Sequence, residues 1–179
     1  MFAVLPERIY QALLSPLVLV FAHGQSLMPT VDYETHLNCS PAGLFDFLSH
    51  IANVPKVTDP NIGITFTSAP DVIEQGSRLD FQIITFGQIV KSTHQIIEFE
   101  RPRLVVEQQV LGPMKSWVHR HEYSATPEGV LMRDQVDFQL PGGLIGLLLS
   151  ESKVRDHLED GFFYREQRLR ELIDQGIIQ

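Results

Sequence analysis

Cysteine is nearly absent from this 179-residue chain, and no apolar run is long enough to cross a bilayer as a helix. The one cysteine, Cys39, cannot form an internal disulfide or build a zinc site from several thiolates. The sequence also lacks a glycine-rich nucleotide loop, a His-Glu-x-x-His motif, a nucleophile elbow and a Ser, His, Asp triad signature. The single cysteine fits a reducing compartment, which we take to be the cytoplasm. The missing motifs exclude the enzyme classes that they identify.

Basic residues are outnumbered, with 14 Lys and Arg against 22 Asp and Glu and a formal net charge of -8. Binding to a phosphate backbone depends on clustered Lys and Arg, so we expect no nucleic-acid partner. Hydrophobic residues make up 44% and charged residues 20%, values that indicate a globular domain. A chain of this length forms one domain that can bury a core or enclose a small pocket.

The N-terminal segment is apolar between residues 12 and 22 and is interrupted by Pro16. Eleven residues are too few for a helix that spans a bilayer, so we expect no stable membrane span. A signal peptide over residues 1–22 would make the protein secreted, but the preceding residues are nearly neutral and no small-x-small cleavage site is clear. We favour a segment that packs on the domain, or a start assigned too early with Met28 as the true beginning. We therefore expect an N-terminal apolar extension at 1–28 and a single domain at 29–176.

The hydrophobic periodicity predicts an α+β domain with about seven strands and a long C-terminal helix. Ser40 followed by Pro41 predicts a helix start after the first strand, with short helices up to about Pro55. The expected strands span residues 31–38, 62–67, 77–86, 89–99, 104–111, 117–123 and 130–140, and the last helix spans about 150–175. Short connections imply an antiparallel sheet, and only the last helix is long enough to cover its apolar face. We expect a curved sheet wrapped around that helix.

Two of these strands, residues 117–123 and 130–140, alternate strongly and place polar side chains on an otherwise apolar face. The Thr-Pro-Glu-Gly turn between them predicts a hairpin whose register puts His121 opposite Asp134. His119 lies one step along the same face. A charge on such a face needs a partner or water, so the face either holds a buried hydrogen-bonded pair or lines a cavity.

Several short motifs carry a family resemblance across about residues 31–173. They are Gly112-Pro113, Trp117-x-His119-x-His121-x-Tyr123, Met132-x-Asp134-x-Val136-x-Phe138-x-Leu140-Pro141-x-Gly143, Leu144-x-Gly146 and Tyr164-Arg165. With these motifs the chain resembles the START-like, or SRPBCC, superfamily, which includes polyketide cyclase/dehydrase-like proteins, and in particular bacterial ligand-binding members of unassigned activity. The resemblance implies a helix-grip fold, with no cofactor and no metal. It does not dictate function, because the superfamily hosts carriers, receptors, modulators and enzymes.

Three roles fit the pairing of His121 with Asp134. The two side chains satisfy each other inside the core, contact a ligand, or act in catalysis with Asp134 orienting His121 for proton transfer, and we favour them in that order. The His-x-His pair with a cross-strand Asp134 also has the ligand types of a zinc or iron site. Opposed His and Asp side chains more often hydrogen-bond each other, so we expect no metal.

We expect a small-molecule pocket between the sheet and the last helix. The candidate ligand-binding residues lie on the inner hairpin face or on the helix: Trp117, His119, His121, Tyr123, Met132, Asp134, Phe138 and Arg165. If the protein is an enzyme, its catalytic candidates are His121, Asp134 and His119. Arg165 either reaches into the pocket to hold an anionic head group or extends from the helix edge, and we favour the edge. The pattern does not fix which face of the sheet carries His94.

Three functions follow from this interpretation. The first is binding or carriage of a hydrophobic or amphipathic small molecule in the cavity. The second is a cyclase or dehydrase-like reaction that uses the His121 and Asp134 pair, with His119 or Tyr123 polarising a carbonyl. The third is an interaction module that modulates a protein partner and has only a vestigial cavity, and a homodimer also stays open.

Overall fold

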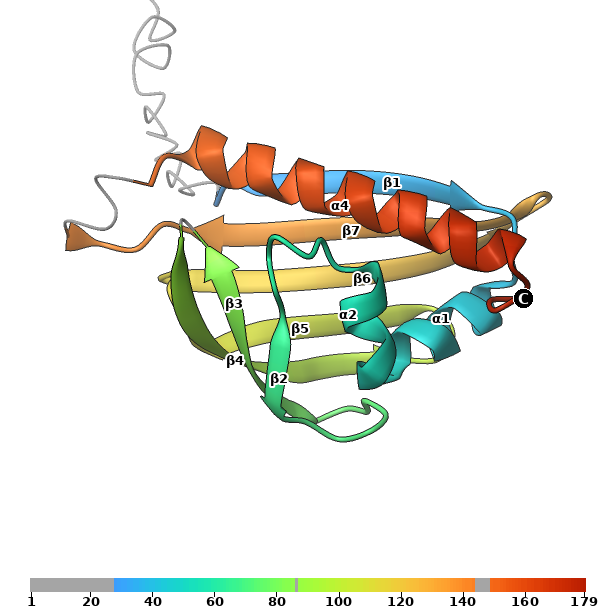
Figure 1. The fold of residues 1–179 in the computed structure, drawn as a ribbon, viewed down its shortest axis with the longest axis horizontal. Helices are drawn as coiled ribbons and strands as arrows, with labels where there is room; N and C mark the ends of the chain where they lie inside the picture. The colour runs from blue at the N-terminus through green and yellow to red at the C-terminus, as the bar shows by residue number, and fades with distance from the viewer. Residues whose placement is uncertain (1–27, 86, 144–148) are drawn as a thin grey trace, which may run out of the picture.

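A computed structural model of the protein describes residues 28–85, 87–143 and 149–179 (Figure 1). The expectations for the apolar N-terminal extension therefore fall outside the described residues, apart from Met28, and so does the Leu144-x-Gly146 motif. Within the described ranges, no helix is both long enough and apolar enough to cross a membrane.

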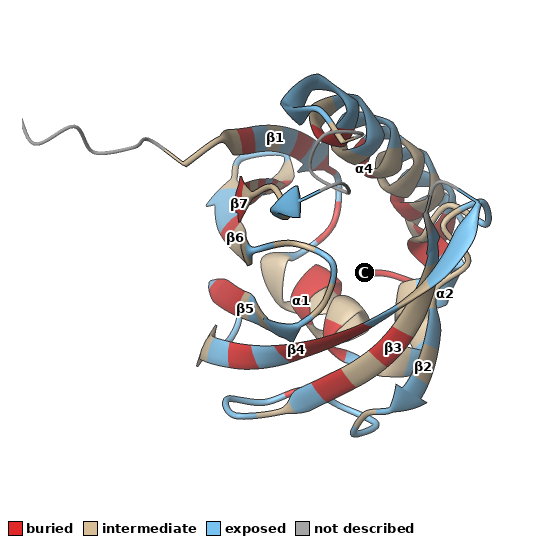
Figure 2. Ribbon diagram, turned by 90° about the vertical axis from the view of Figure 1, so that its left-hand side faces the viewer, coloured by how far each residue is buried: buried red, intermediate tan, exposed pale blue. Residues whose placement is uncertain are grey.

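The strands form one seven-stranded antiparallel sheet in the order β1-β7-β6-β5-β4-β3-β2. Their bounds are β1 Thr30–Leu37, β2 Thr65–Ser68, β3 Arg78–Thr85, β4 Gln88–Glu100, β5 Leu104–Leu111, β6 Ser116–Thr126 and β7 Gly129–Gln139. Strands β2 to β7 pair in the order of the sequence, as the short connections predict. Strand β1 pairs with β7, so β1 and β2 form the two edges of the sheet. Figure 2 shows the resulting curl of the sheet from β1 round to β2.

Short helices lie between β1 and β2: α1 Pro41–Ser49, a 3₁₀ turn at Ile51–Asn53 and α2 Val54–Val57. The predicted helix start is confirmed, because the Ser40 side chain accepts a hydrogen bond from the backbone N–H of Gly43 at 3.0 Å and Pro41 occupies the first turn. Leu44 and Phe45 of α1 are buried completely or almost so. This anchors α1 at one end of the sheet, near the C-terminus (Figure 1).

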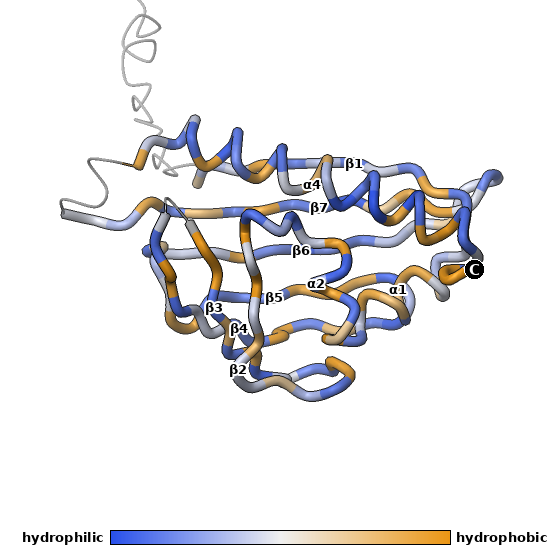
Figure 3. Tube along the Cα trace, in the orientation of Figure 1, coloured by the Kyte–Doolittle hydropathy of each residue, from blue (hydrophilic) through white to orange (hydrophobic). Residues whose placement is uncertain are grey.

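The C-terminal helix α4, Glu151–Asp174, lies across the open side of the curled sheet (Figures 1 and 2). The Ser150 hydroxyl caps its start by accepting from the backbone N–H of Lys153, and Gly176 takes a positive φ of 71° just beyond its end. Hydrophobic and hydrophilic segments alternate along α4 in Figure 3, as expected for an amphipathic helix. The expected helix-grip arrangement is confirmed: a curved antiparallel sheet grips one long helix.

Among the described residues, the interior contains two apolar clusters, both of which meet the inner face of β7. Every second β7 side chain from Val130 to Phe138 is completely buried, and Asp134 is the one charged residue in that series. The larger cluster joins α1, the sheet and the C-terminal part of α4. The smaller one consists of Val31, Val136, Phe138, Val154 and Phe162, with Trp117 packed against it. The smaller cluster fixes the N-terminal half of α4 on β1 and β7.

Replacing Phe138 by alanine should therefore lower the free energy of unfolding by about 3–5 kcal/mol, because a completely buried ring leaves a cavity. The matched control is Phe163→Ala on α4, whose side chain is 59% exposed and should change stability little. Urea denaturation followed by far-UV circular dichroism measures both. Equal losses in the two variants would show that the smaller cluster is not a packed core.

Candidate functional site

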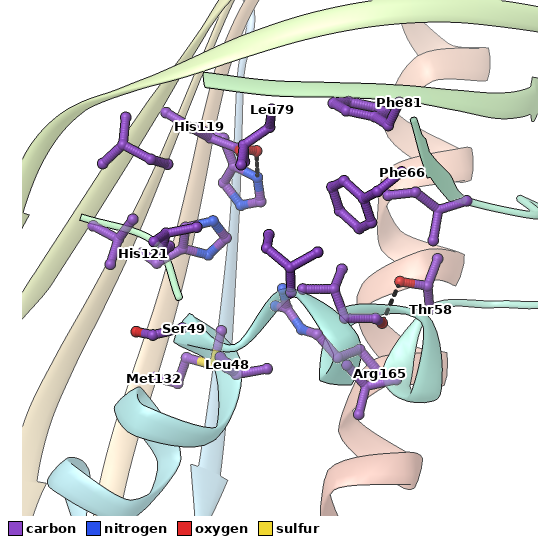
Figure 4. A pocket seen from close by; sticks show the side chains of 18 of the residues that line it. Leu48, Ser49, Thr58, Phe66, Leu79, Phe81, His119, His121, Met132 and Arg165 are labelled. Carbon is purple, nitrogen blue, oxygen red and sulfur yellow. Dashed lines mark hydrogen bonds and ion pairs between the residues drawn. The ribbon is translucent and has the colours of Figure 1, made fainter. Parts of the chain in front are cut away.

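A cavity of about 210 Å³ lies between the inner face of the sheet, the short helices and α4 (Figure 4). Most of its lining is apolar: Leu48, Ile51, Val54, Val57, Ile64, Phe66, Ile73, Leu79, Phe81, Ile96, Val105, Tyr123 and Met132. The polar lining residues are Ser49, Thr58, Glu107, His119, His121 and Arg165. In Figure 4 the two histidines lie on one side of the cavity and the rings of Phe66 and Phe81 on the other. The cavity thus has an apolar body and one ionisable wall.

Strand register brings the ionisable side chains of this wall together. The predicted hairpin register is confirmed, since His121 is the cross-strand partner of Asp134. On the other side of β6, Glu107 of β5 is the direct partner of His119. Arg165 approaches the same place from α4. Four elements that are separated in the sequence therefore converge on this wall.

Asp134 is the centre of the group and has no solvent exposure. Its Oδ1 accepts hydrogen bonds from Nε2 of His119 at 2.9 Å and from Nδ1 of His121 at 2.8 Å. Its Oδ2 accepts from the Arg165 guanidinium. Asp134 is not among the residues that line the cavity, so it lies behind the two imidazoles and fixes their orientation from within the protein.

The protonation of this group follows from its partners. Burial alone would raise the pKa of Asp134, but the charge of Arg165 and the two imidazole donors outweigh it and hold that pKa well below its usual range. An ionised carboxylate only accepts hydrogen bonds, so each imidazole donates the N–H that faces Asp134. The second ring nitrogen of each histidine is then left to interact with other groups.

The two histidines respond differently to this environment. For His119, burial opposes the charged form, but the Asp134 and Glu107 carboxylates raise its pKa above the ordinary value. For His121, burial and the charge of His119 lower the pKa, and Asp134 offsets this only in part. His121 is therefore the neutral imidazole of the pair near neutral pH.

Glu107 adds a second carboxylate on the cavity side. Its Oε1 lies 3.5 Å from Nδ1 of His119 and also 3.5 Å from Nδ1 of His94. Burial opposes its ionisation, but the imidazoles of His94 and His119 hold the pKa of Glu107 well below its usual range. His94 is 7% exposed and packs edge-on against Phe81, with ring centroids 4.9 Å apart. The structure thus assigns His94 to the inner face of the sheet.

The candidate ligand-binding residues fall into three groups. Five line the cavity: His119, His121, Tyr123, Met132 and Arg165. Asp134 lies behind the histidines, and the rings of Trp117 and Phe138 belong to the smaller apolar cluster instead. The preferred edge position for Arg165 is wrong, because its side chain is only 14% exposed and points inward to pair with Asp134 rather than with solvent.

The sequence does not single out Glu107, which lines this wall, and it does not fix the sheet face of His94, which lies next to Glu107. Glu107 is the one charged residue in the strand Leu-Val-Val-Glu-Gln-Gln-Val-Leu, and alternation places it with Val105. That signal was present, but the partner of Glu107 depends on the β5–β6 register, which the loop at 112–115 does not reveal.

No protein-family model and no curated protein sequence matches this chain. Three solved structures illustrate how similar known folds are to this one, by TM-score, sequence identity and the share of each chain that is covered. Major latex-like protein 151 from Panax ginseng has a TM-score of 0.59 and 16% identity, over 79% of this chain and 97% of its own. Ara h 8.0201 has a TM-score of 0.62 and 14% identity, over 83% and 99%. A protein from Thermus thermophilus has a TM-score of 0.63 and 13% identity, over 78% and 96%. The TM-scores establish a common helix-grip fold. Because the sequence identities are this low, they leave function open.

Replacing Asp134 by asparagine should destabilise the protein by about 3–5 kcal/mol, because the substitution leaves the inward Arg165 charge without its carboxylate. Asp32→Asn is the matched control: Asp32 pairs with Arg133 at 2.6 Å, but both side chains are 44% exposed. Exposed pairs contribute little, so that variant should unfold close to the unmutated protein. Chemical denaturation compares the two, and a small loss in Asp134→Asn would mean that the buried cluster is dispensable for folding.

Proposed function

We propose that the protein binds a small amphipathic molecule in the cavity, and that it does so as a member of the START-like superfamily. The observation that supports this most is the cavity itself, which has an apolar lining over most of its surface and ionisable groups on one wall. Small-molecule sites in proteins commonly combine an apolar pocket with a few convergent polar groups.

Packing considerations favour a bound molecule over a structural defect. Protein interiors are close-packed, and atoms that face a void lose their dispersion contacts. The cavity is bordered by large side chains such as Phe66, Phe81 and Met132, whose contacts a ligand would complete. The apolar part of the ligand would lie against these residues.

The polar end of the ligand would face the wall formed by Glu107, His119 and His121. The Glu107 side chain is 20% exposed and that of His121 is 17% exposed, although both residues are enclosed by the fold. Arg165 is already paired with Asp134, so it is not available to hold an anionic head group as its main partner. The ligand that fits best therefore has a modest polar group on a compact apolar body.

The test is native mass spectrometry of gently purified protein, together with titration by the neutral fluorescent probe N-phenyl-1-naphthylamine. We expect one saturable probe site for each chain. Val54 lines the cavity from α2, so Val54→Trp should fill part of it and weaken probe binding by about tenfold or more, equal to about 1.4 kcal/mol.

The matched control is Val72→Trp, at a position that is 44% exposed and does not line the cavity, and probe binding should be unchanged there. Thermal melting of both variants confirms that they fold. If the unmutated protein carries no co-purified molecule and binds no probe saturably, the proposed function is wrong.

A further inference from the structure

We propose that Glu107, His119 and His121 form a binding site for one divalent transition-metal ion of the zinc or iron(II) type. One carboxylate oxygen and one ring nitrogen from each histidine lie within 4.8 Å of one another. Two imidazoles and a carboxylate are a ligand set that such ions accept while keeping a further coordination position open.

The backbone preorganises these ligands on rigid elements. His119 and His121 are alternate residues of β6, so both imidazoles project from the same face of the sheet. Glu107 faces His119 directly across the β5–β6 ladder. Adjacent strands fix the positions of all three Cα atoms, which is the precision that a metal site requires.

Asp134 supplies the orienting group that metal-ligating histidines usually have. A ligating imidazole commonly donates its other N–H to a buried carboxylate, which fixes the tautomer and makes the ligating nitrogen more basic. Here one carboxylate serves both rings: it accepts from Nε2 of His119 and Nδ1 of His121. The nitrogens that remain for an ion are therefore Nδ1 of His119 and Nε2 of His121.

The hairpin pattern alone indicates His119, His121 and Asp134 as ligands, but in this site Glu107 takes the place of Asp134. Asp134 would be the third ligand by cross-strand position, but its two oxygens already accept from His119, His121 and Arg165. Asp134 also does not line the cavity, whereas Glu107 does. Glu107 is thus the carboxylate that reaches an ion on the cavity side.

The three donor atoms would need to move only a short way to bind one ion. The Glu107 Oε1 to His119 Nδ1 distance is 3.5 Å. Two ligand atoms on a tetrahedral zinc ion with bonds of about 2.1 Å lie about 3.4 Å apart, so this pair already has the required separation. One donor atom from each of the three residues lies within 4.8 Å of the other two, so rotation of the side chains would bring the ligands around one ion.

The open coordination position would face the cavity, because all three ligands line it. Water or the oxygen atom of a small molecule could occupy that position. The site does not depend on the proposed function, since the ion is held by protein atoms alone.

Cobalt(II) is the probe for this site, because its visible absorption reports low coordination number. We expect protein that has been stripped with chelator to bind one Co²⁺ for each chain, and Zn²⁺ to displace it. His121→Gln and Glu107→Gln should each weaken binding by at least about 100-fold, and Asp134→Asn, a positioning variant, by about 10- to 100-fold. His36→Gln, at an exposed histidine of β1, is the matched control and should bind like the unmutated protein.

Thermal melting of the same variants shows that they fold, and probe titration of the unmutated protein tests the proposed function separately from this inference. Loss of the cobalt spectrum in a His121→Gln protein that still melts cooperatively supports the metal site. Absence of a cobalt spectrum in the unmutated protein overturns the inference whatever the probe does. Binding that is unaffected by both His121→Gln and Glu107→Gln also overturns it, since the ion would then occupy other surface groups.

Discussion

The buried carboxylate of Asp134 is the interaction on which the rest of the interior depends. It belongs to β7, accepts from two imidazoles of β6 and binds a guanidinium from α4, so three elements meet at one charge. A buried charge costs several kcal/mol unless it is paired, and here the pairing works only if α4 lies where Arg165 reaches Asp134. The position of the helix over the sheet and the orientation of both histidines are therefore coupled.

Asp134 also marks the boundary between the two halves of the interior. On β7 it lies between Met132, which lines the cavity, and Val136, which belongs to the smaller apolar cluster. On one side α4 is packed directly on the sheet through Phe162, and on the other side the sheet and the helices enclose a cavity. The charged centre thus coincides with the point where close packing gives way to the cavity. Because Asp134 lies at this boundary, the two histidines that it orients face the cavity.

The sequence predicts the fold and the centre of the site because both are encoded locally. Alternation, turns and one long amphipathic helix are sufficient for the sheet order, and the tight turn at 126–129 fixes the pairing of His121 with Asp134. The contribution of Glu107 is not local, since it depends on the register across the β5–β6 loop. Alternation correctly turns Phe138 inward, but it cannot say which part of the inner face is hollow. For Arg165 the helical period is ambiguous, because a charge beside an apolar stripe either turns outward or finds a buried partner.

The most direct test of the role of Asp134 is the protonation of His121, measured by long-range ¹H–¹⁵N correlation of the histidine rings near neutral pH. An ionised Asp134 beside His121 predicts a neutral ring with the proton on Nδ1, where it is donated to the carboxylate, and an unprotonated Nε2. The exposed ring of His36 on β1 is the reference ring in the same spectrum. A His121 ring that matches His36, or that carries its proton on Nε2, would contradict the claim that the buried Asp134 carboxylate organises this wall of the cavity.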